Sequence, residues 1–390
     1  MSRKKFKTSN PKILKLSIGI LILTCFGFIY ANITDIYKTG TLILTPDPEF
    51  GKKTDWDSLF YDTAKEIAIA PDGSIFISNK MQHNISKFDK NGKLIKTFAQ
   101  KGVGPSDLLY PSNLSILDDK YLVVGEYASS RRISLFDLNG NFVKVIKTIY
   151  QVFSPLALKN NKIALIKHTT PEKDTTHYII LIRDIQSGND IEVTSFTGKD
   201  KPTLILGKTR FCPWNCRGDV YLARTGNGNL LVGFSLEKNI FIYSPDGKLI
   251  EQIKLDISPV RVNSNMIEEF KKRTLENMRE QHFPDNIIKG IKRVSFDNLM
   301  PEYLPFFNGF LITDEDDIWV LGYTHFIQER NNRVQVYSIT GKPLGNFTID
   351  FGEFSNNINA PMVFHNKCIY GLFEKKNSDD ISLRIIKINL

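Results

Sequence analysis

The sequence predicts an all-β protein built from six similar sheets of four short strands each, and three observations lead to this prediction. From about residue 40 onward, short stretches alternate apolar and polar residues, tight glycine turns recur, and the pattern repeats about every 40 residues. Alternation with period two is typical of strands that bury one face. A repeat of this length with four strands is typical of propeller blades, which cannot bury both faces alone.

A glycine turn joins the last two strands of each repeat. Its copies combine an aromatic residue, Asp or Ser, and a glycine, at 88–94, 136–142, 243–249, 337–343 and, in degenerate form, 183–188. Asn-Gly and Asp-Gly supply the residues with positive φ that tight hairpins need. A second turn at Pro71-Asp72-Gly73 completes the first repeat, for which we expect strands at 65–70, 74–79, 83–89 and 93–99.

The remaining repeats are expected at 113–148, 154–196, 218–254, 307–350 and 358–390. The last repeat is one strand short, whereas residues 41–45 form a strand that belongs to no repeat. We expect this N-terminal strand to complete the sixth blade, because closing the ring removes exposed sheet edges. The prediction is therefore a six-bladed β-propeller over 41–390, with four-stranded antiparallel blades.

Residues 259–306 interrupt the repeats with a helical periodicity. Asn265 and Glu268 have the spacing of a capping box, and Pro284 is expected to end the helix. Apolar residues gather on one face of the predicted helix: Met266, Ile267, Phe270, Leu275 and Met278. We expect the helix either to lie over one propeller face, as a lid or partner surface, or to pack on the blade rim.

The N-terminus has the layout of a targeting segment. Six basic residues and no acidic residue occur in residues 1–15, and an apolar stretch follows at 16–31. Residues 1–31 are therefore predicted to be a signal-anchor helix that contacts the membrane through 13–31, a cleaved signal peptide, or a lipoprotein signal with Cys25 as the lipidated residue. A linker is expected at 32–40, and all three alternatives place the body outside the cytoplasm.

The charge balance and the absence of two catalytic motifs from the sequence argue against several classes of function. The chain has 51 basic and 42 acidic residues, and without residues 1–15 the balance is 45 to 42, which does not indicate nucleic-acid binding. Neither a Gly-x-Ser-x-Gly elbow nor a His-Glu-x-x-His zinc helix occurs. We expect a monomer that needs no cofactor and that binds a peptide, a glycan or a protein.

Candidate ligand-binding residues come from loops expected at the mouth of the central channel: Lys101, Arg131, Arg132, His168, Arg210, Trp214, Tyr323 and His325. Cationic side chains can bind anions, and aromatic rings can stack on sugars and on aromatic side chains of a peptide. The same residues are also compatible with a structural role in inter-blade turns or at solvated strand ends. Cys212 and Cys216 could form a disulfide in an oxidising compartment, stay as structural thiols, or contribute to a metal site.

The first two repeats and a late strand resemble the six-bladed, NHL-repeat-like propellers of bacterial extracytoplasmic proteins. The resemblance is carried by 75–78 with 88–92, by 101–105 leading to Tyr110-Pro111, and by 314–320, where Asp317 stands in place of the usual glycine. It implies the fold and an extracytoplasmic location, and we expect a membrane-tethered binding module. The alternatives are a scaffold in an envelope complex and a lactonase-like, metal-dependent hydrolase or lyase.

Gluconolactonase-like propellers, a comparable scaffold, bind a divalent metal such as calcium through Glu and Asn side chains at the channel. Glu66 and Asn113 lie near the starts of first strands and could imitate two such ligands. The sequence offers no comparable third ligand in the later repeats, so the metal site remains the alternative.

Overall fold

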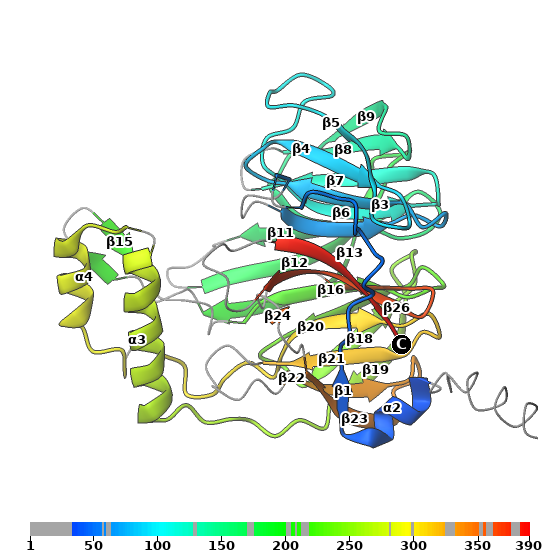
Figure 1. Cartoon of the computed structure of the whole chain (residues 1–390). Coiled ribbons are helices and arrows are strands. Elements are labelled where there is room, and N and C mark those ends of the chain that lie inside the picture. The colour runs from blue at the N-terminus through cyan, green and yellow to red at the C-terminus, as the bar shows by residue number, and fades with distance from the viewer. Residues whose placement is uncertain are drawn as a thin grey trace, which may run out of the picture.

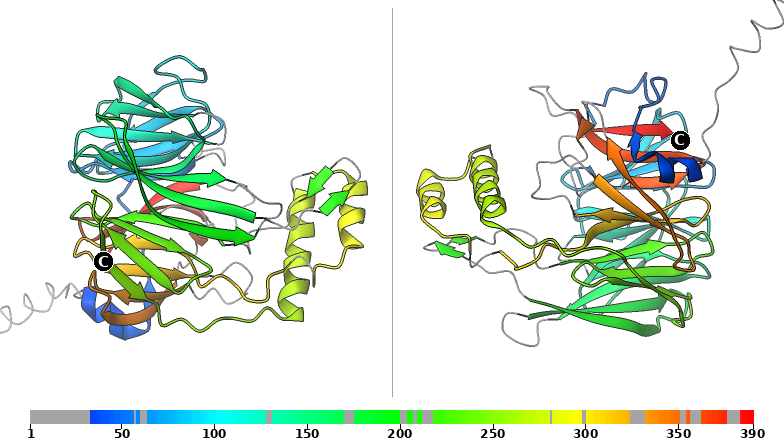
Figure 2. Two further views of the ribbon diagram at one scale, coloured as in Figure 1. Left: turned by 180° about the vertical axis from the view of Figure 1, so that it is seen from behind. Right: turned by 90° about the horizontal axis from the view of Figure 1, so that it is seen from below.

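The computed structural model describes residues 33–56, 58–59, 64–127, 131–169, 175–199, 204–206, 209–211, 218–280, 282–297, 300–323, 332–350, 354–355, 362–375 and 383–390. Apart from one separate two-stranded hairpin, their strands form six sheets. These sheets are arranged around a central axis (Figures 1 and 2). The predicted six-bladed β-propeller is confirmed.

The first four blades are four-stranded antiparallel sheets in chain order. Blade one contains β2 (Ala64–Ile69), β3 (Ile75–Asn79), β4 (Asn84–Phe88) and β5 (Leu94–Phe98). Blade two contains β6 (Pro111–Leu117), β7 (Tyr121–Glu126), β8 (Arg132–Asp137) and β9 (Phe142–Lys147). Blade three contains β10 (Val152–Ala157), β11 (Lys162–Thr169), β12 (Thr175–Asp184) and β13 (Asp190–Lys199). Blade four contains β16 (Val220–Arg224), β17 (Leu230–Phe234), β18 (Asn239–Tyr243) and β19 (Leu249–Lys254).

Blades five and six are joined by the N-terminal segment. Blade five contains β20 (Phe307–Ile312), β21 (Ile318–Gly322), β22 (Asn332–Tyr337) and β23 (Pro343–Asp350), and β1 (Thr41–Ile43) adds a fifth, parallel strand to β23. Blade six contains β25 (Met362–His365), β26 (Cys368–Lys375) and β27 (Leu383–Asn389), and the short β24 (Phe354–Ser355) also pairs with β26.

The N-terminal strand was therefore assigned to the wrong blade, although the segment does reach blade six. Pro46 forms a bridge with Ile388, and the Asp47 amide donates to the Lys387 carbonyl at 2.8 Å. Because Pro46 has no N–H, the contact with β27 remains short. One extended segment thus pairs first with the outer strand of blade five and then with that of blade six.

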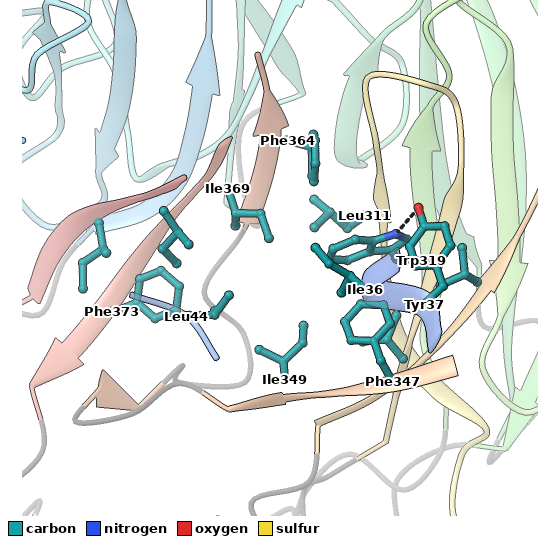
Figure 3. Close-up of a cluster of buried hydrophobic side chains, with 14 residues drawn as sticks. Ile36, Tyr37, Leu44, Leu311, Trp319, Phe347, Ile349, Phe364, Ile369 and Phe373 are labelled. Carbon is teal, nitrogen blue, oxygen red and sulfur yellow. Dashed lines mark hydrogen bonds between the residues drawn. The ribbon is translucent and has the colours of Figure 1, made fainter. Parts of the chain in front are cut away.

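The expected linker at 32–40 instead contains a helix, α2 (Ile33–Thr39), which packs on β23. Ile36 and Tyr37 are buried in the core between blades five and six, and the Tyr37 ring stacks on Phe347 (Figure 3). The Tyr37 hydroxyl donates to Asp317 at 2.6 Å and accepts a hydrogen bond from Trp319 Nε1 at 3.2 Å. These contacts explain why the segment is a fixed part of the ring.

Each of six buried apolar cores is shared by two neighbouring blades. Blade one, for example, contributes Phe76 and Ile85 to a core with blade two and Ile75 and Ile77 to a core with blade six. This alternation follows from the two-residue period of a strand, which sends successive side chains to opposite faces. The ring is therefore held together by the burial of both faces of every blade.

The insertion contains α3 (Ser264–Glu280) and α4 (Asp285–Lys292), and Pro284 precedes α4 as its N-cap residue. The expected capping box at Asn265 is wrong, because Asn263 Oδ1 accepts the Met266 amide at 3.0 Å. A separate hairpin, β14 (Leu204–Leu206) with β15 (Thr209–Phe211), lies beside the helices in Figures 1 and 2. Among the described helices, none is both long and apolar enough to cross a bilayer, and the predicted anchor at 13–31 lies outside the described residues.

Candidate functional site: the channel mouth

The inner strands of the six blades surround a central cavity of about 690 Å³. The mouth is the end of this channel at which the inner strands β2, β6, β10, β16, β20 and β25 begin. The insertion leaves after β19 and returns at the start of β20, so it projects from the mouth side (Figure 1). The cavity wall mixes apolar and polar surface, and several of the polar side chains gather at the mouth.

Irregular pairing at the mouth places these polar side chains. The register shifts between Ala64 and Glu66, Pro111 and Asn113, Phe153 and Leu156, and Phe307 and Gly309, in blades one, two, three and five. Each shift is a bulge, which re-aims side chains and is frequent next to binding sites. In blade three the bulge also holds Ser154 at a φ of 47°, a left-handed conformation that is uncommon for serine.

Glu66 and Asn113 lie together in the channel, as neighbours on the inner strands of blades one and two. The Asn113 side chain lies close enough to Glu66 to favour its charged form, and Asn113 Oδ1 accepts the Ser112 hydroxyl at 3.1 Å. Burial raises the pKa of Glu66 from 4.5 to about 8, and the hydrogen bonds from Asn113 and from the Ile67 backbone only partly oppose this shift. Glu66 is therefore a neutral carboxyl group at pH 7, able both to donate and to accept a hydrogen bond.

Three further polar side chains line the cavity at its mouth: Ser154, Asp219 and Asn308. All three are half-buried, and Ser154 and Asn308 make no side-chain hydrogen bond with the described part of the chain. Together with Glu66 and Asn113, they bring side chains from five blades to one end of the channel. These side chains can form hydrogen bonds with a ligand from several directions without a change in the backbone.

His168 lines the cavity at the end of β11, as its predicted place at the mouth requires. Its ring stacks on Phe153, with centroids 4.0 Å apart, and meets the Tyr178 ring edge to face at 4.9 Å. This aromatic packing fixes the imidazole against the wall of blade three. Its partner in the prediction, His325, lies outside the described residues.

Lys101, Arg131 and Arg132 do not line the channel. Lys101 and Arg131 are exposed, whereas Arg132 holds the 101–107 loop in place. The Arg132 guanidinium donates to Glu126 Oε1 at 2.6 Å and to the Asp107 carbonyl at 2.8 Å. Glu126 is buried, so the pair keeps a loop closed rather than presenting a free cation.

Tyr323 follows β21 of blade five and does not line the channel, because it packs against the helical core of the insertion around Phe270 and Phe296. Arg210 is part of β15, and its side-chain placement is not described. Trp214, Cys212 and Cys216 lie outside the described residues, so the aromatic-cation cluster and the disulfide remain predictions.

The described channel residues do not complete a metal site. No three His, Cys, Asp or Glu side chains converge anywhere in the described ranges. Of the predicted pair of ligands, Asn113 Oδ1 already accepts the Ser112 hydroxyl at 3.1 Å, and Glu66 brings a single carboxyl group. Calcium prefers six to eight oxygen ligands, so no catalytic step is assigned to a metal here.

Comparison with known proteins agrees with the fold. A protein from Bacteroides fragilis that is assigned as exported matches with a TM-score of 0.51 and 10% identity, over 90% of this chain and 99% of that one. A DUF4221 family member from Bacteroides vulgatus matches with a TM-score of 0.48 and 10% identity, over 84% of this chain and 93% of that one. Virginiamycin B lyase from Staphylococcus aureus matches with a TM-score of 0.40 and 12% identity, over 84% of this chain and 95% of that one. No family model and no curated protein matches the sequence.

At these identities the likenesses concern the fold alone. The predicted resemblance to six-bladed bacterial propellers is confirmed at that level. Which residues bind a ligand must be argued from the channel itself.

Proposed function

We propose that this protein is an extracytoplasmic binding module that holds a peptide or glycan ligand in the channel mouth. The observation that carries the proposal is the convergence of Glu66, Asn113, Ser154, Asp219 and Asn308 at the mouth of a cavity of about 690 Å³. Pockets of this size, with polar groups at fixed positions, are typical of ligand sites. The ring of shared cores fixes those positions in advance, which lowers the entropic cost of binding.

The extracytoplasmic location is supported by the basic and apolar N-terminal segment and by the likeness to an exported Bacteroides fragilis protein. The position of α2 indicates which end of the propeller would face the membrane. β1 runs parallel to β23 toward the mouth, so α2 lies at the opposite end of the propeller, as Figure 1 shows. If residues 13–31 remain as a membrane anchor, the mouth and the insertion point away from the membrane.

A titration of the purified protein with short peptides and envelope glycan fragments tests the proposal, with the melting temperature as readout. At least one compound class should stabilise the protein saturably. Asn308→Ala should weaken that effect, because the Asn308 amide faces the cavity and makes no hydrogen bond with the described residues. Asn139→Ala is the matched control, since Asn139 is exposed on the turn between β8 and β9, at the other end of the propeller. Stabilisation that both variants retain in full would contradict a site at the mouth.

The second candidate is a metal-dependent hydrolase or lyase, which is favoured only by the contact between Glu66 and Asn113. Metal analysis of the purified protein is expected to find no stoichiometric divalent ion. Tightly held calcium or zinc that is lost in Glu66→Gln would favour the enzyme instead. A scaffold role would require that the insertion, rather than the channel, retains an envelope partner.

A further inference from the structure

Arg224 is an arginine inside the central channel, at the end opposite the mouth. It is the last residue of β16 and lines the same cavity as Glu66. Its Nη1 donates to the carbonyl of Ile116 at 2.7 Å, so the side chain extends from blade four to blade two, past blade three. Ile116 belongs to an inner strand, whose channel-facing edge has no further strand to pair with.

The guanidinium group is poorly compensated at this position. In the described part of the chain it makes this one hydrogen bond, although a guanidinium carries five N–H donors. No described carboxylate forms an ion pair with it, and Asp119 and Asp118 act on it only through longer-range attraction. Asp118 is already engaged, because its carboxylate accepts the amides of Asn160 and Asn161 at 2.9 and 2.8 Å.

Arg224 is half-buried, and burial lowers the pKa of its guanidinium more than the attraction of Asp119 and Asp118 raises it. A charge that is partly withdrawn from water without a close counter-ion is costly, and an apolar side chain in its place is often neutral or stabilising. An arginine with spare donors directed at a cavity is also the geometry that binds a carboxylate through two parallel hydrogen bonds. The stability of the fold therefore does not explain why an arginine occupies this position, whereas the binding of an anionic ligand would explain it.

We infer that Arg224 is an anion-recognition residue, and that the ligand of the channel carries a carboxylate group that pairs with it. This inference rests on the proposed function, because it concerns the ligand of the same cavity. From Val220 to Arg224 a strand advances by about 13 Å. A ligand that contacts both the mouth and Arg224 would thus be a peptide of about four extended residues, ending in its C-terminal carboxylate, or an acidic oligosaccharide of similar length.

The test uses three forms of the full-length protein: wild type, Arg224→Met and Arg131→Met. Arg131→Met is the matched control, because Arg131 is exposed and does not line the cavity. The first probe is sodium acetate against sodium chloride at equal ionic strength, with the melting temperature as readout. Acetate should stabilise the wild type and Arg131→Met saturably and equally, and its apparent affinity should fall by about tenfold or more in Arg224→Met. Equal responses of all three forms would overturn the inference.

Further arms separate the two sources of the carboxylate. Tetra-alanine is compared with its C-terminal amide, and a glucuronate-terminated disaccharide with its neutral counterpart. The charged member of one pair should bind more tightly to wild type, and this preference should disappear in Arg224→Met. If both members of a pair bind equally in wild type, and Asn308→Ala weakens both, the mouth binds a ligand and the assignment of Arg224 fails alone.

The stability of ligand-free Arg224→Met separates this role from a structural one. If Arg224 serves a ligand, the melting temperature of Arg224→Met without ligand should equal or exceed that of wild type, because a desolvated charge has been removed. A fall of several degrees would mean that the guanidinium ties blade four to blade two, and it would overturn the inference.

Discussion

The blades and the helical insertion are stabilised in different ways. Every blade buries both faces in cores shared with its neighbours, so the loss of one core affects two sheets. The insertion instead has a core of its own, which includes Phe270, Ile291 and Phe296. It is connected to blades four and five through two paired chain segments, in which the Val262 amide donates to Glu302 and the Leu304 amide to Val260, each at 2.9 Å.

Because of this difference, we expect the ring to unfold as one unit, whereas the insertion can open locally. Local opening requires few buried contacts with the rest of the molecule. In the described residues, the packing of Tyr323 on the helical core is the principal apolar link between the insertion and blade five. The channel, by contrast, is built entirely from ring strands and should share the cooperativity of the ring.

The largest effect is expected from Trp319→Ala in the ring. Trp319 is fully buried, meets Phe347 edge to face at 4.8 Å and donates to the Tyr37 hydroxyl. The substitution leaves a large cavity and should lower the free energy of unfolding by about 3–5 kcal/mol, measured by urea denaturation with circular dichroism. Val143→Ala, at a half-exposed position of an outer strand, is the control. A loss near that of the control would contradict the shared-core description.

A smaller, pH-dependent effect is expected from Glu66→Gln. The native pKa of about 8 lies above the unfolded value of 4.5, so the unfolded chain releases this proton first as the pH rises. The contribution of Glu66 to stability is therefore greatest below pH 4.5 and is lost progressively up to about pH 8. Between pH 5 and 8, the wild type should lose on the order of a few kcal/mol relative to Glu66→Gln.

Urea denaturation at several pH values measures this difference, and Glu49→Gln, at an exposed position, is the control. Parallel pH profiles for wild type and Glu66→Gln would mean that the carboxyl is hydrated and that the channel is not a buried part of the ring.

The smallest effect on global stability is expected from Phe270→Ala in the insertion. Phe270 is buried in the helical core. Hydrogen exchange in α3 should become faster, whereas the main unfolding transition should shift by less than about 0.5 kcal/mol, because the ring cores are untouched. A global loss comparable to that of Trp319→Ala would show that the insertion and the ring unfold together, and the comparison would be wrong.

The sequence was sufficient to predict the blades because their turns are encoded locally. The four predicted strands of blade one differ from the observed ones by at most one residue at each end, since Gly73 and Gly92, both with positive φ, fix where the strands reverse. Glu66 and Asn113 were found by a local signal as well, namely a polar side chain near the start of an inner strand.

The rest of the site could not be predicted, because it depends on contacts between blades. The bulges next to Ser154 and Asn308 have no sequence signature, yet they decide which side chains enter the channel. Arg224 is an ordinary strand end in the sequence, and only the ring brings it to Ile116. Thr41–Ile43 was placed on the wrong blade because three residues fit either edge, and the packing of Tyr37 on Phe347 decides between them.

The bridge between the N-terminal segment and β27 has a consequence for how the chain matures. Asp47 and Lys387, which form an ion pair at 3.1 Å, are separated by 340 positions. During synthesis, the early residues emerge long before their partners, so the ring cannot lock until nearly all of its chain has left the ribosome or the translocon. Contacts of such sequence separation make folding slow. A nascent chain halted before residue 383 would present an unpaired edge on β26, a surface that chaperones of its compartment would have to protect.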